Sequence, residues 1–177
     1  MQDNIAIIGL GYVGLPLALE LAKNFDVIGF DVSVRRTREL KAHQDRTGVA
    51  SRETLRNSSL RITSTTNDLV GRAIYIVTVP TPVDSEKQPD LSALLNACKA
   101  VGQLMRKGSI IVFESTVYPG VTEEICGPEL EQTSGLISGK EFFLGYSPER
   151  MNPGDEEHTV DRITKVVLSL ESNNPAS

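Results

Sequence analysis

Short apolar runs alternate along the chain with stretches that carry apolar residues at helical spacing. The apolar runs are nearly continuous in Ile, Val, Leu and Phe, which is typical of strands buried on both faces of a parallel sheet. They predict six strands, at residues 4–8, 26–31, 60–63, 73–79, 109–114 and 142–146. The stretches between them predict five helices, at residues 15–23, 34–43, 51–57, 91–105 and 122–132. This alternation predicts an α/β fold, a doubly wound parallel sheet with helices on both faces.

The end of the chain has a different pattern. Residues 151–161 are polar, acidic and rich in turn formers, which indicates a loop, and residues 163–170 are apolar again, which indicates one more strand. We therefore expect a domain at residues 1–150, followed by a C-terminal loop and last strand at residues 151–177.

Charge and composition narrow the function. The 177 residues contain 18 Lys and Arg against 23 Asp and Glu, giving a net charge of −5, and no Trp. An acidic chain with few aromatic residues is a poor candidate for binding nucleic acid. Two cysteines, Cys98 and Cys126, and two histidines are too few for a disulfide scaffold or a metal site, and a cytoplasmic location is expected.

The uncharged stretch at residues 5–19 needs a separate interpretation. It contains three glycines and Pro16, follows no basic segment and is short for a membrane span. We interpret it as core structure of a soluble domain, so neither a signal peptide nor a membrane partner is expected.

A glycine motif follows the first predicted strand. Gly9, Gly11 and Gly14 have G-x-G-x-x-G spacing and precede a predicted helix, an arrangement that lets a backbone turn and a helix N-terminus approach a pyrophosphate. Asp31 ends the second strand 22 residues after Gly9, where a carboxylate binds the adenosine ribose and repels a 2′-phosphate. The pattern predicts a Rossmann-type domain, with three αβα layers, that binds NAD. Arg35 and Arg36 leave NADP open, and a Rossmann-like fold with another ligand is the alternative.

Four segments along the chain read GYVGLP at 11–16, VPTP at 79–82, ESTVYPG at 114–120 and SPERMNPG at 147–154. In this order they resemble the UDP-glucose/GDP-mannose dehydrogenase family. The last segment, with His158 and Thr159 after it, resembles the branch that acts on UDP-N-acetylhexosamines. The resemblance covers the chain up to about residue 167. It implies oxidation of the C6 alcohol of a nucleotide sugar to a carboxylate with two NAD, through a thioester on a cysteine.

The resemblance also implies a role for individual residues. Asp31 holds the adenosine ribose with Arg36 beside the adenine end, Thr116 helps to hold the catalytic water, and Glu149 is the general acid/base. The residues expected to bind the cofactor are Gly9, Gly11, Tyr12, Val13, Gly14, Asp31, Arg36, Val79, Pro80, Thr81, Ser115 and Thr116. Those expected to bind the substrate, a UDP-sugar, are Glu149, Arg150 and Asn152.

The catalytic cysteine of that family lies in a second domain downstream, and this chain has no counterpart to it. Cys98 and Cys126 lie in apolar helical stretches and are expected in the core. Leu168 stands where the family usually has a glycine. We therefore expect the NAD-binding domain of a homodimeric 6-dehydrogenase, shortened and inactive alone.

Two alternatives stay open. One is a free-standing, non-catalytic dinucleotide-binding module. The other is a β-hydroxyacid dehydrogenase, a group that shares the glycine motif and lacks the SPER segment.

Overall fold

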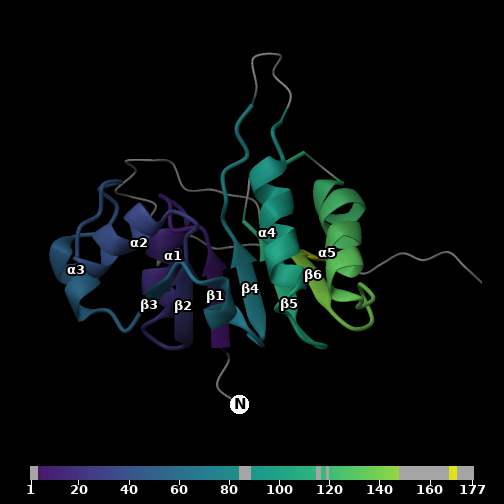
Figure 1. Ribbon diagram of the computed structural model, residues 1–177, viewed down its shortest axis with the longest axis horizontal. Coiled ribbons are helices and arrows are strands. Elements are labelled where there is room, and N and C mark those ends of the chain that lie inside the picture. The colour runs from purple at the N-terminus through teal and green to yellow at the C-terminus, as the bar shows by residue number, and fades with distance from the viewer. Residues whose placement is uncertain (1–3, 84–88, 115–116, 119, 148–167, 171–177) are drawn as a thin grey trace, which may run out of the picture.

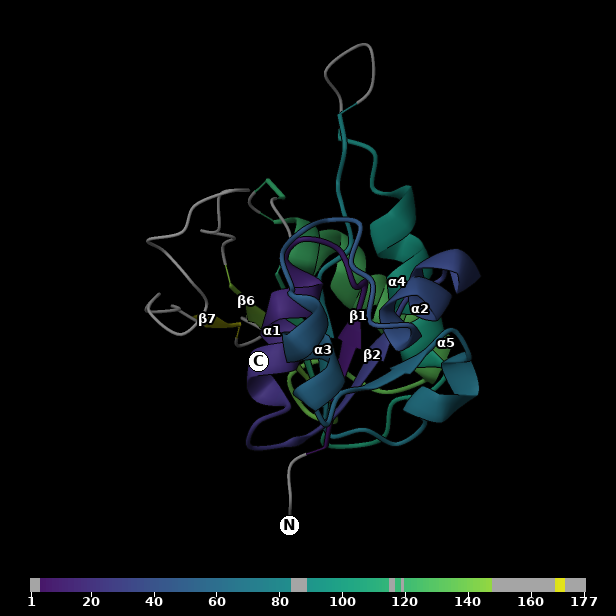
Figure 2. The same ribbon diagram turned by 90° about the vertical axis from the view of Figure 1, so that its left-hand side faces the viewer.

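The computed structural model describes residues 4–83, 89–114, 117–118, 120–147 and 168–170. Its centre is one sheet with the strand order β3-β2-β1-β4-β5-β6-β7. Figure 1 labels the first six strands in this order, and Figure 2 labels β7. The first six are parallel and the last is antiparallel. Their bounds are β1 Asn4–Ile8, β2 Asp26–Phe30, β3 Arg61–Thr63, β4 Ile74–Val77, β5 Ile110–Phe113, β6 Phe143–Tyr146 and β7 Leu168–Leu170. The predicted parallel sheet is confirmed, and each of the six strands predicted between residues 4 and 146 is present within two residues at either end.

Strand β1 shows why these runs are apolar throughout. Ile5 and Ile7 face one side of the sheet and pack with Leu15 of helix α1 (Gly14–Leu21). Ala6 and Ile8 face the other side and join a second core that contains residues of α4 (Ser92–Gly102) and α5 (Gly127–Ser134). Figure 2 shows α1 on one side of the sheet and α4 and α5 on the other. Both faces are therefore covered, as the predicted three-layer arrangement requires.

The remaining helices connect the strands. They are α2 (Val34–Lys41), α3 (Arg52–Asn57), the 3₁₀ turn η1 (Thr66–Leu69) and the π-helical turn η2 (Val121–Cys126). Ser33 and Ser51 cap α2 and α3, because their side chains accept hydrogen bonds from Arg36 N–H and Thr54 N–H. The helix predicted at 122–132 is the π-helical turn followed by α5. A 3.6-residue apolar period does not separate these two helix types.

The seventh strand lies at the edge of the sheet. Leu144 of β6 pairs with Leu170 of β7, and Tyr146 pairs with Leu168. The strand predicted at 163–170 is therefore present at 168–170, while residues 163–167 lie outside the described ranges. Residues 168–170 extend the sheet formed by the first 150 residues. No helix in the described ranges has the length and apolar character needed to cross a membrane.

Candidate functional site

A cavity of about 500 Å³ lies at the carboxyl ends of the parallel strands. Strands β1 and β4 are neighbours in the sheet, so the chain turns to opposite sides after leaving them. Ligands of open α/β sheets bind in the crevice that forms at this point. The residues that line the cavity follow β1, β2, β4 and β5: Gly9, Gly11, Tyr12, Val13, Asp31, Thr78, Val79, Pro80, Thr81, Pro82 and Glu114.

The glycine turn is packed tightly at its two ends. Gly9 has a φ of +98°, a conformation that favours glycine, and its N–H donates to the Phe30 carbonyl over 2.8 Å. A Cβ placed on Gly14 would lie 2.0 Å from the Gly9 carbonyl oxygen and 2.3 Å from Thr78 Oγ1. No side chain fits at residue 14, so α1 begins directly against the turn.

The middle of the turn is open instead. A Cβ placed on Gly11 would meet no atom within 4 Å. Within the described ranges, the N–H groups of Gly11, Tyr12 and Val13 make no hydrogen bond. They precede α1, whose N-terminus carries a partial positive charge. Free donors beside open space fit a phosphate group at this place.

Asp31 lies directly after β2 and lines the same cavity. Its Oδ2 accepts a hydrogen bond from Leu10 N–H at 3.0 Å, and its Oδ1 accepts one from Ser33 N–H at 2.8 Å. A carboxylate has about four acceptor positions, so roughly two remain for a ligand. The arrangement can therefore accept hydrogen bonds from a pair of hydroxyl groups.

The structure brings most of the predicted cofactor residues together. Eight of them line the cavity: Gly9, Gly11, Tyr12, Val13, Asp31, Val79, Pro80 and Thr81. Gly14 does not line it but packs against the Gly9 carbonyl at the end of the turn. Arg36 does not line it. The Arg36 side chain is buried, and its Nε donates to the Leu10 carbonyl over 2.8 Å while Nη1 donates to Asp45 over 2.7 Å.

Thr78 and Glu114 were missed as site residues. Thr78 is buried, and its hydroxyl donates to the carbonyls of Ile8 and Gly9. Glu114 is buried, and its N–H donates to the Val77 carbonyl over 2.8 Å. Both directly follow strands whose ends meet at the crevice, and that position would have identified them.

Five predicted residues lie outside the described ranges: Ser115, Thr116, Glu149, Arg150 and Asn152. Their expected parts in catalysis and in cofactor and substrate binding stay predictions.

The two cysteines take no part in this cavity. Cys98 and Cys126 are buried together in the core that packs under α4 and α5. A hydrogen bond with Cys126, together with burial, raises the pKa of the Cys98 thiol. A protonated, buried thiol is a poor nucleophile, so the expected core role of Cys98 is confirmed.

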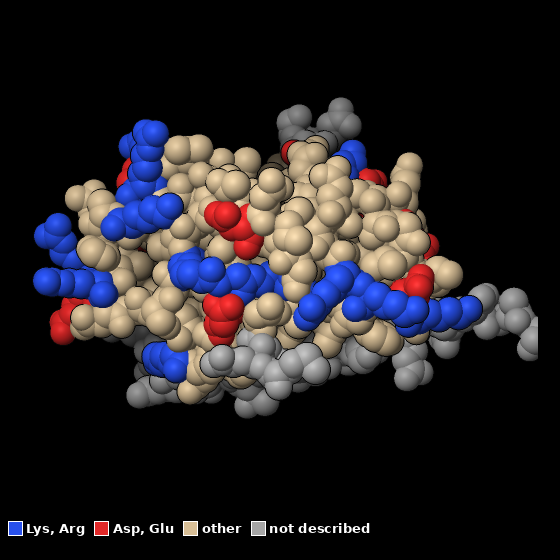
Figure 3. Space-filling view, turned by 60° about the horizontal axis from the view of Figure 1, so that its bottom comes forward, with Lys and Arg blue, Asp and Glu red and all other residues tan. Residues whose placement is uncertain are grey.

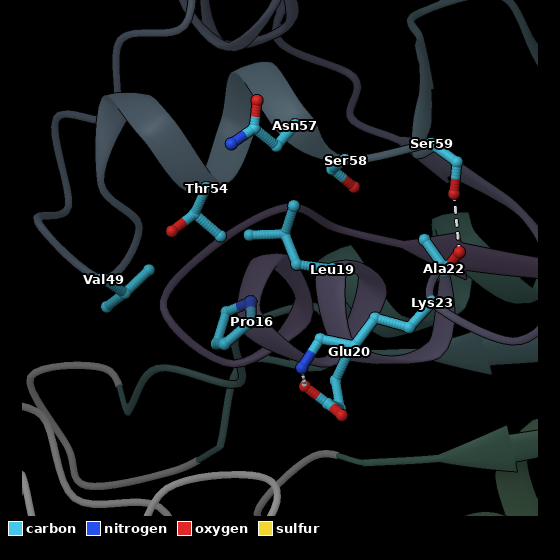
Figure 4. Close-up of a pocket in the computed structure, with 10 residues that line it drawn as sticks. All are labelled: Pro16, Leu19, Glu20, Ala22, Lys23, Val49, Thr54, Asn57, Ser58 and Ser59. Carbon is cyan, nitrogen blue, oxygen red and sulfur yellow. Dashed lines mark hydrogen bonds and ion pairs between the residues drawn. The ribbon is translucent and has the colours of Figure 1, made fainter.

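A second groove lies between α1 and α3 and has a volume of about 620 Å³ (Figure 4). Its charged side chains, Glu20 and Lys23, bond to each other, and Ser59 Oγ donates to the Ala22 carbonyl over 2.6 Å. No glycine turn borders it, and its lining offers no charged side chain free for a ligand. The groove is therefore a weaker candidate for a ligand-binding site than the crevice.

A row of basic side chains lies at the amino ends of the strands, on the side of the sheet opposite the crevice (Figure 3). Cations at or just before the first residues of β3 to β6 are Arg61, Arg72, Arg106, Lys107 and Lys140. Arg61 and Arg72 both pair with Asp26, and the C-termini of the crossover helices at this edge favour positive charge. These charges complement the local structure and leave the crevice as the candidate site.

The fold and the crevice together define a Rossmann-type dinucleotide-binding domain. A sequence model described as the UDP-glucose/GDP-mannose dehydrogenase family, NAD binding domain, matches residues 3–176, and the chain belongs to this family. The resemblance found in the motifs is confirmed, and the chain is an NAD-binding domain.

Three relatives illustrate the match. "Protein CapL" of Staphylococcus aureus is 51% identical over 94% of this chain and 39% of its own length. A UDP-N-acetyl-D-glucosamine 6-dehydrogenase of Pseudomonas aeruginosa is 51% identical over 94% of this chain and 40% of its own. The solved structure of a UDP-D-ManNAc dehydrogenase from Pyrococcus horikoshii is 35% identical and superposes with a TM-score of 0.77, covering 85% of this chain and 37% of its own. This chain thus spans about two fifths of the length of each of these relatives.

Proposed function

We propose that this chain holds NAD in the crevice and serves as the cofactor-binding part of a UDP-N-acetylhexosamine 6-dehydrogenase. The observation that carries the proposal is that Asp31 and the open glycine turn line the same cavity. A relative at 51% identity, a UDP-N-acetyl-D-glucosamine 6-dehydrogenase, supports the substrate class.

Each side of the crevice has its own task in this proposal. The N–H groups of Gly11, Tyr12 and Val13 bind the pyrophosphate, helped by the positive end of α1. Asp31 accepts hydrogen bonds from the adenosine ribose hydroxyls. Val79, Pro80 and Thr81 form the wall on the β4 side.

Bound NAD supplies a hydride acceptor for the oxidation of an alcohol. The residues proposed for the steps on the sugar are Thr116 and Glu149, with Arg150 and Asn152 binding the substrate. Cys98 and Cys126 do not line the crevice, so the proposal gives this chain cofactor binding and no covalent step. A UDP-sugar substrate, a homodimeric complete enzyme and a cytoplasmic location belong to the same proposal.

NAD is favoured over NADP by the carboxylate of Asp31. A 2′-phosphate on the ribose would place a second negative charge beside this group, which is already held in place by two N–H donors. The exposed Arg35 side chain, which pairs with Glu39, is the group that an NADP preference would require.

Calorimetric titration of the chain with NAD and with NADP tests the proposal. We expect saturable binding of NAD and at least tenfold weaker binding of NADP, which corresponds to about 1.4 kcal/mol. Absence of NAD binding, or a preference for NADP, would reject it.

A further inference from the structure

Positive charge is concentrated in one segment of the chain. Residues 34–57, which contain α2 and α3, carry seven Lys and Arg against three Asp and Glu, whereas the whole chain carries 18 against 23. This segment, which we call the basic segment, therefore has a net charge of +4 in a chain of net charge −5. Figure 1 shows α2 and α3 at the β3 end of the sheet, and Figure 3 shows Lys and Arg side chains gathered there. A local excess of one charge attracts ligands of the opposite charge.

Three of the seven cations have carboxylate partners within the basic segment. Arg36 pairs with Asp45 over 2.7 Å, and both side chains are buried. Burial alone would raise the pKa of the Asp45 carboxyl, but hydrogen bonds from Thr47 and Arg36 outweigh burial and lower it, so the pair stays charged at neutral pH. The other two ion pairs share one carboxylate: Arg35 with Glu39 and Arg46 with Glu39.

The other four cations make no ion pair with any residue that the structure describes. Arg38 and Lys41 lie in the last turn of α2, where the helix dipole favours a positive charge. Arg52 and Arg56 lie four residues apart on α3, and like charges at this spacing repel each other. Arg52 is also the first residue of α3, the end at which the dipole disfavours a cation. Local stability therefore explains the two cations of α2 but not the two arginines of α3.

The two arginines of α3 lie at a pocket. It has a volume of about 830 Å³ and is lined by His43, Arg52, Glu53, Arg56 and Asn57. It shares no residue with the crevice. Ser51 already caps α3, so the positive charge of the pocket comes from side chains. Two guanidinium groups and one carboxylate, that of Glu53, give the lining a net positive charge.

His43 borders the same pocket in an unfavourable backbone conformation. It follows α2 and the C-cap residue Ala42, and among the residues that the structure describes it is the one non-glycine with a positive φ, +56°. Glycine is the usual residue at this position, because a Cβ is strained there. The histidine instead brings to the pocket an imidazole ring, which can donate a hydrogen bond to an anion. Residues that act against local stability and meet at one place are typical of a functional site.

We propose that this pocket is a second ligand site, which binds a diphosphate group through the side chains of Arg52, Arg56 and His43. A guanidinium group matches the geometry of a phosphate and can bind it through two N–H donors. Side chains four residues apart on a helix start about 5 to 6 Å from each other, so each arginine can hold one of two linked phosphates. The volume of the pocket lies within the range of small-molecule sites. The proposal does not depend on NAD binding in the crevice.

An NMR titration of the ¹⁵N-labelled chain with pyrophosphate tests the proposal at an ionic strength of about 0.1 M. We expect saturable shifts of the amide resonances of His43 and of residues 52–57. Shifts confined to the glycine turn at residues 9–14, or no saturable shift at His43 and residues 52–57, would overturn the proposal.

A matched pair of variants separates a site from general attraction by the basic segment. Arg52→Gln/Arg56→Gln should weaken binding at the pocket by about tenfold or more. Arg38→Gln/Lys41→Gln removes the same two charges from exposed positions on α2 and should leave the affinity within about twofold. Equal weakening in the two variants would overturn the proposal.

The stability of the ligand-free variant gives an independent readout. Arg52 and Arg56 are exposed, and their replacement relieves a repulsion, so the unfolding midpoint of Arg52→Gln/Arg56→Gln should equal or exceed that of the unchanged chain. A midpoint lower by more than about 2 °C would show that the two arginines stabilise the fold, which contradicts the argument for a site.

Two further ligands identify the source of the diphosphate. UDP that binds the same residues more tightly than pyrophosphate would assign the pocket to a nucleoside diphosphate, and equal affinities would assign it to the diphosphate alone; both results support the site. Inorganic phosphate should bind at least fivefold more weakly than pyrophosphate, because it offers one phosphate group to two arginines. Equal affinities for phosphate and pyrophosphate would overturn the proposal.

Discussion

The hydroxyl of Thr78 donates a hydrogen bond to the carbonyl of Gly9 over 2.8 Å and so joins the end of β4 to the glycine turn after β1. The same hydroxyl donates to the Ile8 carbonyl over 3.1 Å. These two strands are neighbours in the sheet, and the crevice opens where their loops separate. Thr78, at the end of the neighbouring strand β4, therefore holds the glycine turn in place beside the crevice.

Thr78→Val should lower the free energy of unfolding by about 1 to 2 kcal/mol, because the Gly9 carbonyl loses the hydroxyl donor. The Ile8 carbonyl keeps its hydrogen bond from Thr78 N–H at 2.9 Å. Thr78→Ser keeps the hydroxyl and should recover most of that loss. Urea unfolding of the three proteins measures both effects. Equal stability of the Val and Ser variants would show that the hydroxyl contributes nothing.

Gly14→Ala should lower the free energy of unfolding by roughly 3 kcal/mol or more, because the added Cβ would lie 2.0 Å from the Gly9 carbonyl oxygen. The contact is with the backbone of Gly9 in the turn after β1, which cannot move away without disturbing the turn. Thermal unfolding followed by circular dichroism measures the effect. A midpoint equal to that of the unchanged chain would refute the close packing.

Asp31→Ala should weaken NAD binding by about tenfold or more and should bring the affinities for NAD and NADP close together. The carboxylate that accepts from the ribose and repels a 2′-phosphate is then gone. Asp31→Asn should also weaken binding, because Leu10 and Ser33 both present N–H groups and the amide retains one acceptor oxygen. If Asp31→Ala still prefers NAD over NADP, Asp31 is not the residue that repels the 2′-phosphate.

The Asp45 carboxylate makes stability dependent on pH. Its folded pKa is lowered, so its contribution is fully present above the unfolded value of about 4 and is lost as the pH falls through the folded value. Asp45→Asn should destabilise the chain by roughly 3 kcal/mol at pH 7, because Arg36 is left without its buried partner.

The stability difference between Asp45→Asn and the unchanged chain should narrow below about pH 4. Urea unfolding from pH 7 to pH 3 measures this. Comparing the two proteins cancels the contributions of other carboxylates, such as Asp26, whose pKa is also lowered. A constant difference over this range would contradict the account.

The strands and the glycine turn were predictable because each has a local cause. A buried parallel strand requires a continuous apolar run, and Asp31 follows one directly. Arg36 was harder to place, because it lies five residues after Asp31 in the sequence while its partners Leu10, Asp45 and Thr47 meet it only in the folded chain. Thr78 carries no motif of its own. Its role depends on β4 lying beside β1, which is a property of the sheet order.

The most direct test of the crevice as the NAD site is calorimetric titration of NAD into the unchanged chain and into Gly11→Ala. A Cβ at residue 11 meets no protein atom within 4 Å, so the variant should unfold within about 2 °C of the unchanged chain. The added methyl group would occupy space where the pyrophosphate approaches the backbone. We predict saturable NAD binding to the unchanged chain and at least tenfold weaker binding to Gly11→Ala. Equal affinity in the two proteins would contradict the account.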